Sequence, residues 1–264
     1  MNCGNLQNVF GDAHPVAVVT GAGAPRVGRA VAETLHAAGY RIVVHANSSI
    51  ERAKEVAMRL SVVGPDAIAL PADLSDEGQA RWLIRESHEH FGRIDALVHT
   101  AAIWAPKPLE AVTADDVRRS FDVNTLSAFV LSQAVGLIMA GQASGGAIVN
   151  FGDWGIARPY PDYAAYFPSK GAIPTLTRSL AVELAERNRR VRVNAILPGP
   201  VLLAPDTSEN RRESAIESTL LKRVGTPEHV AHAVRFLLEN DFVTGICLPV
   251  DGGRTIYAPF IDPS

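Results

Sequence analysis

Residues 16–30 read Val-Ala-Val-Val-Thr-Gly-Ala-Gly-Ala-Pro-Arg-Val-Gly-Arg-Ala, and this stretch decides the fold of the chain. The first five residues are rich in valine and predict a short buried strand. The glycines that follow let the backbone approach a pyrophosphate, and a helix after them offers free N–H groups and the positive end of its dipole. The stretch therefore predicts a βα turn that holds a dinucleotide, although an ordinary βα turn can look the same.

The alternation of strand and helix patterns continues along the whole chain. Short β-rich runs predict strands at 16–20, 41–46, 67–71, 96–100, 147–151, 192–197 and 245–249. Apolar residues at three- and four-residue steps predict helices over 26–38, 49–62, 76–91, 114–139, 163–187 and 227–239. We expect an α/β fold, a Rossmann-type doubly wound parallel sheet of about seven strands with helices on both faces.

Composition and strand spacing bound the domain organisation. Residues 1–14 are polar and predict a loose N-terminal extension, and residues 15–264 predict a single domain. Residues 199–223 contain proline, serine and glutamate after the sixth strand, where open α/β sheets place loops that cover ligands. We interpret that segment as a substrate loop.

The charge of the chain excludes several classes of partner. The net charge is −3 without any basic run, which argues against nucleic acid and against anionic membrane surfaces. We find no apolar run of about 18 to 20 residues, the length that crosses a bilayer. Cys3 and Cys247 cannot form a disulfide framework, and we expect no metal site. These features predict a cytoplasmic protein that acts on a small molecule.

Tyr166 and Lys170 form the clearest chemical motif. Their spacing places a phenol and an ammonium on one helix face, one turn apart. A nearby cation favours phenolate, so we expect Lys170 to lower the pKa of Tyr166 and let it transfer a proton near neutral pH. Asp153 precedes Tyr166 by thirteen residues, at a strand end where aspartate is also a common turn residue.

With the glycine-rich turn, this spacing resembles the short-chain dehydrogenase/reductase family over about residues 15 to 255. Most members carry serine where this chain has Asp153. Aspartate there, together with Arg26 in the glycine-rich turn, resembles the pteridine reductase branch. The resemblance implies that Tyr166 is the general acid, that Lys170 holds the nicotinamide ribose, and that Asn124 holds a water of the proton relay.

The resemblance also implies a substrate site made of Arg26, Trp104, Asp153 and Tyr166. An ionised Asp153 cannot donate a hydrogen bond to a carbonyl oxygen, but it can accept one from the amino group of a heterocycle. A protonated Asp153, with its pKa raised by burial, would donate instead. Trp104 can stack on a flat substrate or close the core under a loop. Both alternatives stay open for each residue.

The cofactor expected from the resemblance is NADPH. NAD-preferring folds usually place an acidic residue after the second strand, and residues 45–49 contain none. Asn47, Ser48 and Ser49 could donate to a 2′-phosphate; a loop without preference for either cofactor is the alternative. The implied cofactor site comprises Gly21, Gly23, Arg26, Val27, Gly28, Asn47, Ser48, Ser49, Asp73, Leu74, Ala101, Ala102, Asn124, Tyr166, Lys170, Pro198, Gly199 and Val201.

Three functions are compatible with these residues. The first is an NADPH-dependent oxidoreductase that reduces a pterin or a similar flat heterocycle, with Tyr166 as proton donor. The second is a carbonyl reductase or alcohol dehydrogenase of the same family, acting on a 3-oxoacyl, sugar or small ketone substrate. The third is a non-catalytic NADP-binding regulator, against which Asn124, Tyr166 and Lys170 argue. The resemblance further implies a homotetramer.

Overall fold

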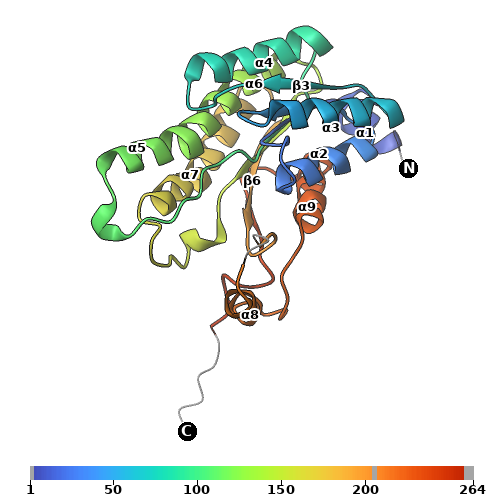
Figure 1. Ribbon diagram of the computed structural model, residues 1–264. Helices are drawn as coiled ribbons and strands as arrows, with labels where there is room; N and C mark the ends of the chain where they lie inside the picture. The colour runs from blue at the N-terminus through green and yellow to red at the C-terminus, as the bar shows by residue number, and fades with distance from the viewer. Residues whose placement is uncertain (1–2, 204–206, 259–264) are drawn as a thin grey trace.

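The computed structural model describes residues 3–203 and 207–258, and its centre is one seven-stranded parallel sheet (Figure 1). The strand order is β3-β2-β1-β4-β5-β6-β7, and every neighbouring pair is parallel. The predicted Rossmann-type fold is therefore confirmed. The strands are β1 (Val16–Thr20), β2 (Arg41–Ala46), β3 (Ala67–Pro71), β4 (Ala96–His99), β5 (Gly146–Phe151), β6 (Val191–Pro198) and β7 (Cys247–Val250).

Helices cover both faces of the sheet. The core on one face contains side chains of α1 (Cys3–Phe10), α2 (Val27–Ala37), α3 (Ile50–Val63) and α9 (Pro227–Glu239). The core on the other face contains side chains of α4 (Glu77–Phe91), α6 (Ser127–Gly141) and α7 (Tyr166–Ala185). The remaining elements are the short helices η1 (Leu109–Ala111), α5 (Ala114–Phe121), η2 (Asp122–Leu126), η3 (Trp154–Ile156) and α8 (Glu209–Glu217).

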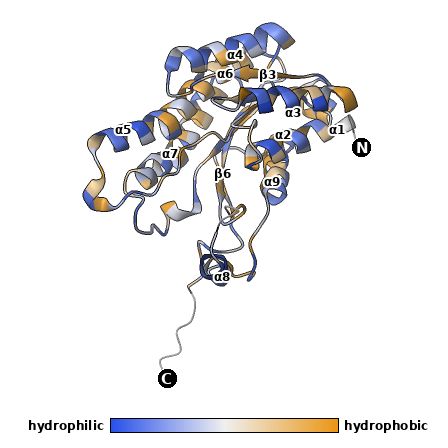
Figure 2. Cartoon of the chain, in the orientation of Figure 1, coloured by the Kyte–Doolittle hydropathy of each residue, from blue (hydrophilic) through white to orange (hydrophobic). Residues whose placement is uncertain are grey.

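Successive side chains along the strands point alternately into the two cores. In β1, Ala17 and Val19 point into the first core and Val18 points into the second, and all three are fully buried. Strands buried on both faces need continuous apolar runs, which explains why β1 and β2 lack polar alternation. Figure 2 shows the corresponding pattern in the helices, which turn hydrophilic residues outward along α3 and α4.

The N-terminal segment is an ordered helix, so the expected loose extension is wrong for residues 3–14. Leu6 and Phe10 of α1 are buried in the first core at 2% and 1% exposure. The Phe10 ring meets the Tyr40 ring edge to face at 5.9 Å. Asp12 then forms ion pairs with Arg41 and Arg93. A helix of eight residues is too short to produce a clear periodic signal in the sequence.

Two other segments differ from expectation. Residues 199–223 are not one irregular loop, because α8 forms within them below the carboxyl end of β6 (Figure 1); residues 204–206 lie outside the described part. The helix predicted over 114–139 is present as Ala114–Gly141, in which α5 and α6 are joined through the π-helical turn η2. The expectation that no apolar stretch reaches the length of a bilayer is wrong, because this helix is long and apolar enough by composition alone. Half of that apolar stretch is buried within the fold, which is typical of a core helix.

The buried N-terminal helix predicts a large cost for removing one ring from it. Phe10→Ala should lower the free energy of unfolding by about 3–5 kcal/mol, because the change leaves a cavity beside Tyr40. Urea unfolding followed by circular dichroism measures this loss. The matched control is Gln7→Ala on the exposed side of α1, which should change stability by less than about 0.5 kcal/mol. Equal, small effects of both changes would show that α1 does not stabilise the domain.

Candidate active site

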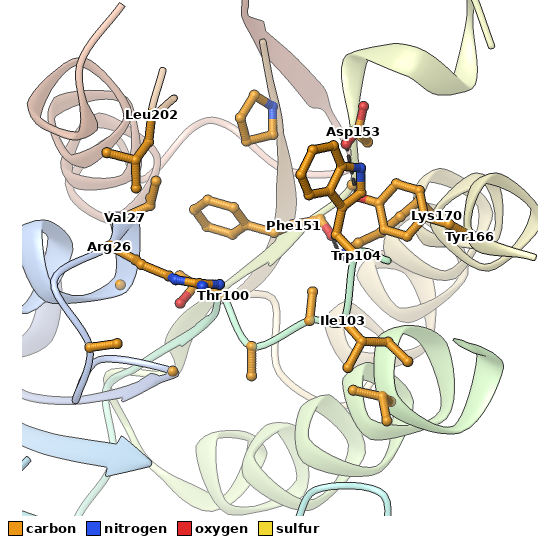
Figure 3. Close-up of a pocket in the computed structure, with 18 of the residues that line it drawn as sticks. Arg26, Val27, Thr100, Ile103, Trp104, Phe151, Asp153, Tyr166, Lys170 and Leu202 are labelled. Atoms are coloured by element: carbon orange, nitrogen blue, oxygen red, sulfur yellow. Dashed lines mark hydrogen bonds between the residues drawn. The ribbon is translucent and has the colours of Figure 1, made fainter. Parts of the chain in front are cut away.

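A cavity of about 920 Å³ opens at the carboxyl ends of the central strands (Figure 3). This is the edge at which open parallel sheets bind ligands. All residues predicted for the site line this cavity except Gly23, Asn124 and Val201. The fold thus brings together residues from the glycine-rich turn, from the end of β2 and from the Asp153–Lys170 region, which lie far apart in the sequence.

The glycine-rich turn forms one wall of the cavity. Gly21 adopts a φ of +66°, which side-chain-bearing residues rarely adopt. A Cβ on Gly28 would lie 2.5 Å from the Thr100 hydroxyl, so only glycine fits there. Helix α2 begins at Val27, and the Arg26 side chain does not cap it; in Figure 3 that side chain extends across the cavity beside Thr100. The turn therefore presents backbone N–H groups and a guanidinium, which suit a pyrophosphate.

A neutral histidine fixes this turn to the second strand. The backbone N–H of Gly21 donates to His45 Nδ1 at 3.2 Å, so the other ring nitrogen carries the hydrogen and donates to the Ala72 carbonyl at 3.0 Å. Burial lowers the pKa of His45 to about 4, and the ring stays uncharged at neutral pH. His45 was not predicted as a site residue, and its position after a run of valines is the only sequence signal for it.

The end of β4 is held by a second buried histidine. Ser127 donates to the Val123 carbonyl at 2.6 Å, which leaves its oxygen to accept from His99 Nε2 at 3.0 Å. His99 Nδ1 then accepts from the Thr20 hydroxyl at 3.0 Å. Burial lowers the pKa of His99 to about 3. Thr20 in turn accepts from the backbone N–H of Ala101, so this chain of bonds positions the cavity wall at the end of β4.

The residues that follow the carboxyl end of β2 supply polar groups for the part of a dinucleotide that lies away from the catalytic residues. Asn47, Ser48 and Ser49 line the cavity as predicted, and Arg52 from the first turn of α3 joins them. Asp73 lies nearby, and hydrogen bonds from Ser75 lower the pKa of its carboxyl. No acidic side chain from 45–49 is available to bind a ribose hydroxyl, as the sequence shows.

Tyr166, Asp153 and Lys170 meet at the opposite end of the cavity (Figure 3). The Tyr166 hydroxyl donates to Asp153 Oδ2 at 2.8 Å. The other carboxyl oxygen accepts from the backbone N–H of Gly155 at 2.7 Å, because Asp153 caps the short helix η3. Lys170 Nζ donates to the Phe151 carbonyl at 2.8 Å. Helix α7 begins at Tyr166, so the predicted one-turn spacing of phenol and ammonium is present.

The electrostatics of this group differ from expectation. Burial, and then the charge of Asp153, raise the pKa of Tyr166 well above its ordinary value. The expectation that Lys170 lowers it is wrong for the protein in this state, because the carboxylate is the charged group that Tyr166 contacts. Burial also raises the pKa of Asp153 and lowers that of Lys170 to about 8. All three groups therefore favour their neutral forms more than they would in water.

Three predicted residues do not line the cavity. The Asn124 side chain is fully buried in η2, where it accepts from Ile103 N–H and donates to the Ile103 carbonyl and the Ser169 hydroxyl. It ties the loop after β4 to α7, and both of its amide hydrogens are used within the protein. Gly23 packs against Ser49, where a Cβ would lie 2.8 Å from the hydroxyl. Val201 is part of the first core.

Aromatic rings form one side of the catalytic end. Trp104 is 58% exposed and stacks on Tyr163 at 5.1 Å, with an angle of 12° between the rings. Trp154 is only 8% exposed and stacks on Tyr160 at 5.8 Å. Trp104 therefore does not close the core, as one interpretation of the sequence had it, but presents a ring to the cavity.

Positive charge dominates the cavity. Among the described residues that line it, the carboxylates are Asp73 and Asp153, whereas four arginines and Lys170 supply cations. Only one of those arginines was predicted from the sequence, because the others come from helices and from the C-terminal segment and belong to no recognisable motif. The four are Arg26, Arg52, Arg119 and Arg254. This balance suits a dianionic or trianionic cofactor.

Metal ligands are not grouped anywhere in the part of the chain that the structure describes: no set of three histidine, cysteine or acidic side chains could hold an ion there.

Comparison with known proteins identifies the family of the chain. Residues 22–255 match the family model described as enoyl-(acyl carrier protein) reductase. The chain is 33% identical to the 3-oxoacyl-[acyl-carrier-protein] reductase of Synechocystis, over 92% of this chain and 97% of that protein. It is also 33% identical to versicolorin reductase 1 of Aspergillus parasiticus, over 90% and 95% of the two chains.

A solved structure agrees with this family assignment. A protein assigned as a short-chain alcohol dehydrogenase from Sinorhizobium meliloti superposes with a TM-score of 0.84 and 31% identity. The match covers 91% of this chain and 96% of that one. The cavity lies at one edge of the parallel sheet and is lined by both the glycine-rich turn and the Tyr166–Lys170 pair. From these features and the comparisons, the chain belongs to the short-chain dehydrogenase/reductase family and is an oxidoreductase.

Proposed function

We propose that the chain is an NADPH-dependent reductase of carbonyl compounds. The observation that carries this proposal is the contact between Tyr166 and Asp153 at the end of a cavity whose remaining length suits a dinucleotide. The relatives that are named as 3-oxoacyl and versicolorin reductases support a carbonyl substrate. When bound, the nicotinamide cofactor supplies a hydride to the carbonyl carbon; the protein must supply a proton to the oxygen.

The proton comes from the Asp153–Tyr166 pair. While Asp153 is ionised, the Tyr166 hydrogen points at its carboxylate and is not available to a substrate. A protonated Asp153 can instead donate to the Tyr166 oxygen, and the Tyr166 hydrogen is then free to bond the substrate oxygen. Because burial raises the pKa of Asp153, this protonated form persists to a higher pH than in an exposed carboxyl.

Lys170 has a supporting role at this site. It is 3% exposed, and its ammonium bonds the Phe151 carbonyl at the end of β5. Its charge lowers the pKa of Asp153, against the larger effect of burial, and so limits how far that pKa rises. Lys170 also lines the cavity, where its remaining hydrogens can bond the ribose hydroxyls of the cofactor.

The cofactor preference follows from the groups at the end of β2. Arg52 and the hydroxyls of Ser48 and Ser49 line the cavity together. A 2′-phosphate there would meet hydrogen-bond donors and a guanidinium, whereas a ribose hydroxyl would find no carboxylate from residues 45–49. Arg52 adds a cation to the polar side chains predicted from the sequence at this end of the cavity. We therefore favour NADPH over NADH.

A second candidate is reduction of a pterin or a similar flat heterocycle, as in the pteridine reductase branch. Two observations favour it: the exposed ring of Trp104 beside the cavity, and a carboxylate where serine usually stands. In that function Asp153 would be ionised and would accept a hydrogen bond from a ring amino group. The two candidates thus require opposite protonation states of Asp153.

We further propose that the protein is a homotetramer, assembled through the helices of the α5–α6 and α7 layer. Leu126, Leu137 and Val182 expose 46%, 53% and 65% of their surfaces on these helices. Light scattering should give the mass of four chains of 28.2 kDa. Leu137→Glu should reduce that mass, since it buries a charge in the contact. A wild-type mass of one chain would overturn the proposal.

The Asp153 protonation state predicts a distinctive pH profile. Ketone reduction should fall as pH rises through the raised pKa of Asp153, by about tenfold per pH unit. Asp153→Asn mimics the protonated acid, because its amide hydrogen can donate to Tyr166 while its oxygen keeps the Gly155 bond. Its kcat should stay constant between about pH 5 and 8. Steady-state kinetics on a ketone with NADPH measures both profiles.

The same variant separates the two candidate functions. If the protein is a carbonyl reductase, Asp153→Asn keeps its activity on ketones, and neither the wild type nor the variant reduces dihydropterin. With pterin reduction, the wild type turns over dihydropterin, and Asp153→Asn loses about 100-fold because the carboxylate acceptor is gone. Tyr166→Phe is the control and should abolish either activity. An Asp153→Asn profile as steep as that of the wild type would overturn the proposed proton source.

The cofactor preference predicts a selective effect of Arg52. Arg52→Ala should raise the KM for NADPH by about tenfold, through loss of a charge-assisted contact with the phosphate, and leave the KM for NADH within about twofold. Initial rates with each cofactor measure both constants. Arg59→Ala, on the exposed part of α3 outside the cavity lining, is the matched control and should change neither. Equal increases for both cofactors would contradict a role at the 2′ position.

A further inference from the structure

Arg254 occupies an unusual place at the catalytic end of the cavity. It comes from the segment after β7, and its guanidinium lies 4.0 Å from the centre of the Trp154 ring. It also lines the cavity together with Asp153 and Tyr160. The Arg254 charge is close enough to Asp153 to lower the pKa of that carboxyl, in opposition to burial. A cation from the C-terminal segment is thus placed beside the reacting groups.

The guanidinium has hydrogens left for a ligand. In the part of the chain that the structure describes, Arg254 has no ion pair and no side-chain hydrogen bond. The two carboxylates whose charges act on Arg254 accept hydrogen bonds from other groups. Asp251 accepts from the backbone N–H groups of Gly253 and Thr255. Asp153 accepts from Gly155 and Tyr166. Stacking on Trp154 uses the face of the guanidinium and leaves its N–H edge free.

The segment that carries Arg254 is held in place by other residues. Arg158 donates to the backbone carbonyls of Arg254 and Tyr257. The Arg254 N–H donates to the Asp251 carbonyl at 3.2 Å. Gly252 and Gly253 adopt φ values of +64° and +80°, which turn the chain back toward the cavity. The backbone around Arg254 is therefore held in place, and the contact with Trp154 orients the guanidinium. Such preorganisation lowers the entropic cost of binding.

The aromatic side chains around the cavity indicate which kind of chemical group the rest of a substrate contains. Trp154 is buried and already covered by Arg254 and Tyr160, so it serves to hold the cation. Trp104 is the exposed ring, and its surface can cover a flat group. A ligand that reaches Tyr166 therefore meets an aromatic surface at Trp104 and a free guanidinium at Arg254.

We propose that the preferred substrate is an aromatic carbonyl compound that carries a carboxylate or another anionic group, bound by Arg254. This inference rests on the proposed carbonyl reductase function and adds the substrate class. The planar fork of the guanidinium matches a carboxylate through two parallel hydrogen bonds. Arg254 then determines specificity, while Tyr166 and Asp153 transfer the proton.

Matched ketones test this role. Wild-type protein with NADPH should reduce 4-acetylbenzoate with a kcat/KM about tenfold higher than that for its methyl ester. Arg254→Gln should lower the kcat/KM for the acid by about 10- to 100-fold and that for the ester by less than about threefold. The kcat/KM of Arg254→Lys for the acid should lie between those of the wild type and Arg254→Gln, because an ammonium lacks the planar fork. Arg85→Gln, an exposed arginine of α4, is the matched control and should change neither value.

A binding measurement separates this inference from the proposed function. Calorimetry with benzoate and benzamide requires no turnover, and benzoate should bind the wild type about tenfold more tightly than it binds Arg254→Gln. Benzamide should bind both proteins equally. If the wild type reduces neither ketone but binds benzoate through Arg254, the proposed function fails and the anion site stands. Equal losses on acid and ester, or equal benzoate affinity of the two proteins, would overturn the anion site.

Discussion

The hydrogen bond between Tyr166 and Asp153 is the interaction on which the site depends. Burial disfavours a negative charge on either partner, and the two anions would repel each other at 2.8 Å. Whether the pair holds one proton or two therefore decides whether the phenol can donate to a substrate. The fold sets this contact by ending β5 at Phe151, capping η3 with Asp153 and starting α7 at Tyr166.

The cavity combines two electrostatic tasks along one sheet edge. Its arginines create a positive field for an anionic dinucleotide. At its catalytic end, by contrast, burial raises the pKa of Asp153 and lowers the pKa of Lys170 to about 8. Neutral histidines, His45 and His99, connect the strand ends under both regions without adding charge. The same sheet edge thus carries arginines that suit an anionic cofactor and a buried acid pair that suits proton transfer.

Much of this arrangement could be predicted from the sequence. Strand and helix periodicity predicted the sheet, and helix geometry predicted that Tyr166 and Lys170 share one face. The place of Asp153 beside Tyr166 was implied by the family resemblance. The pKa of Tyr166 was predicted in the wrong direction, since burial and its hydrogen-bond partner are properties of the folded state. Arg254 could not be predicted, because only the turn after β7 brings it to the cavity.

The strand order has a consequence for synthesis of the chain. Val19 of β1 pairs with Val98 of β4, which is 79 residues later. At a translation rate of about 5–20 residues per second, β1 has an open edge for roughly 4 to 16 seconds before its partner exists. An unpaired valine-rich edge can join another strand and aggregate. During synthesis this chain therefore exposes an aggregation-prone edge of β1 until the middle of the sheet is complete.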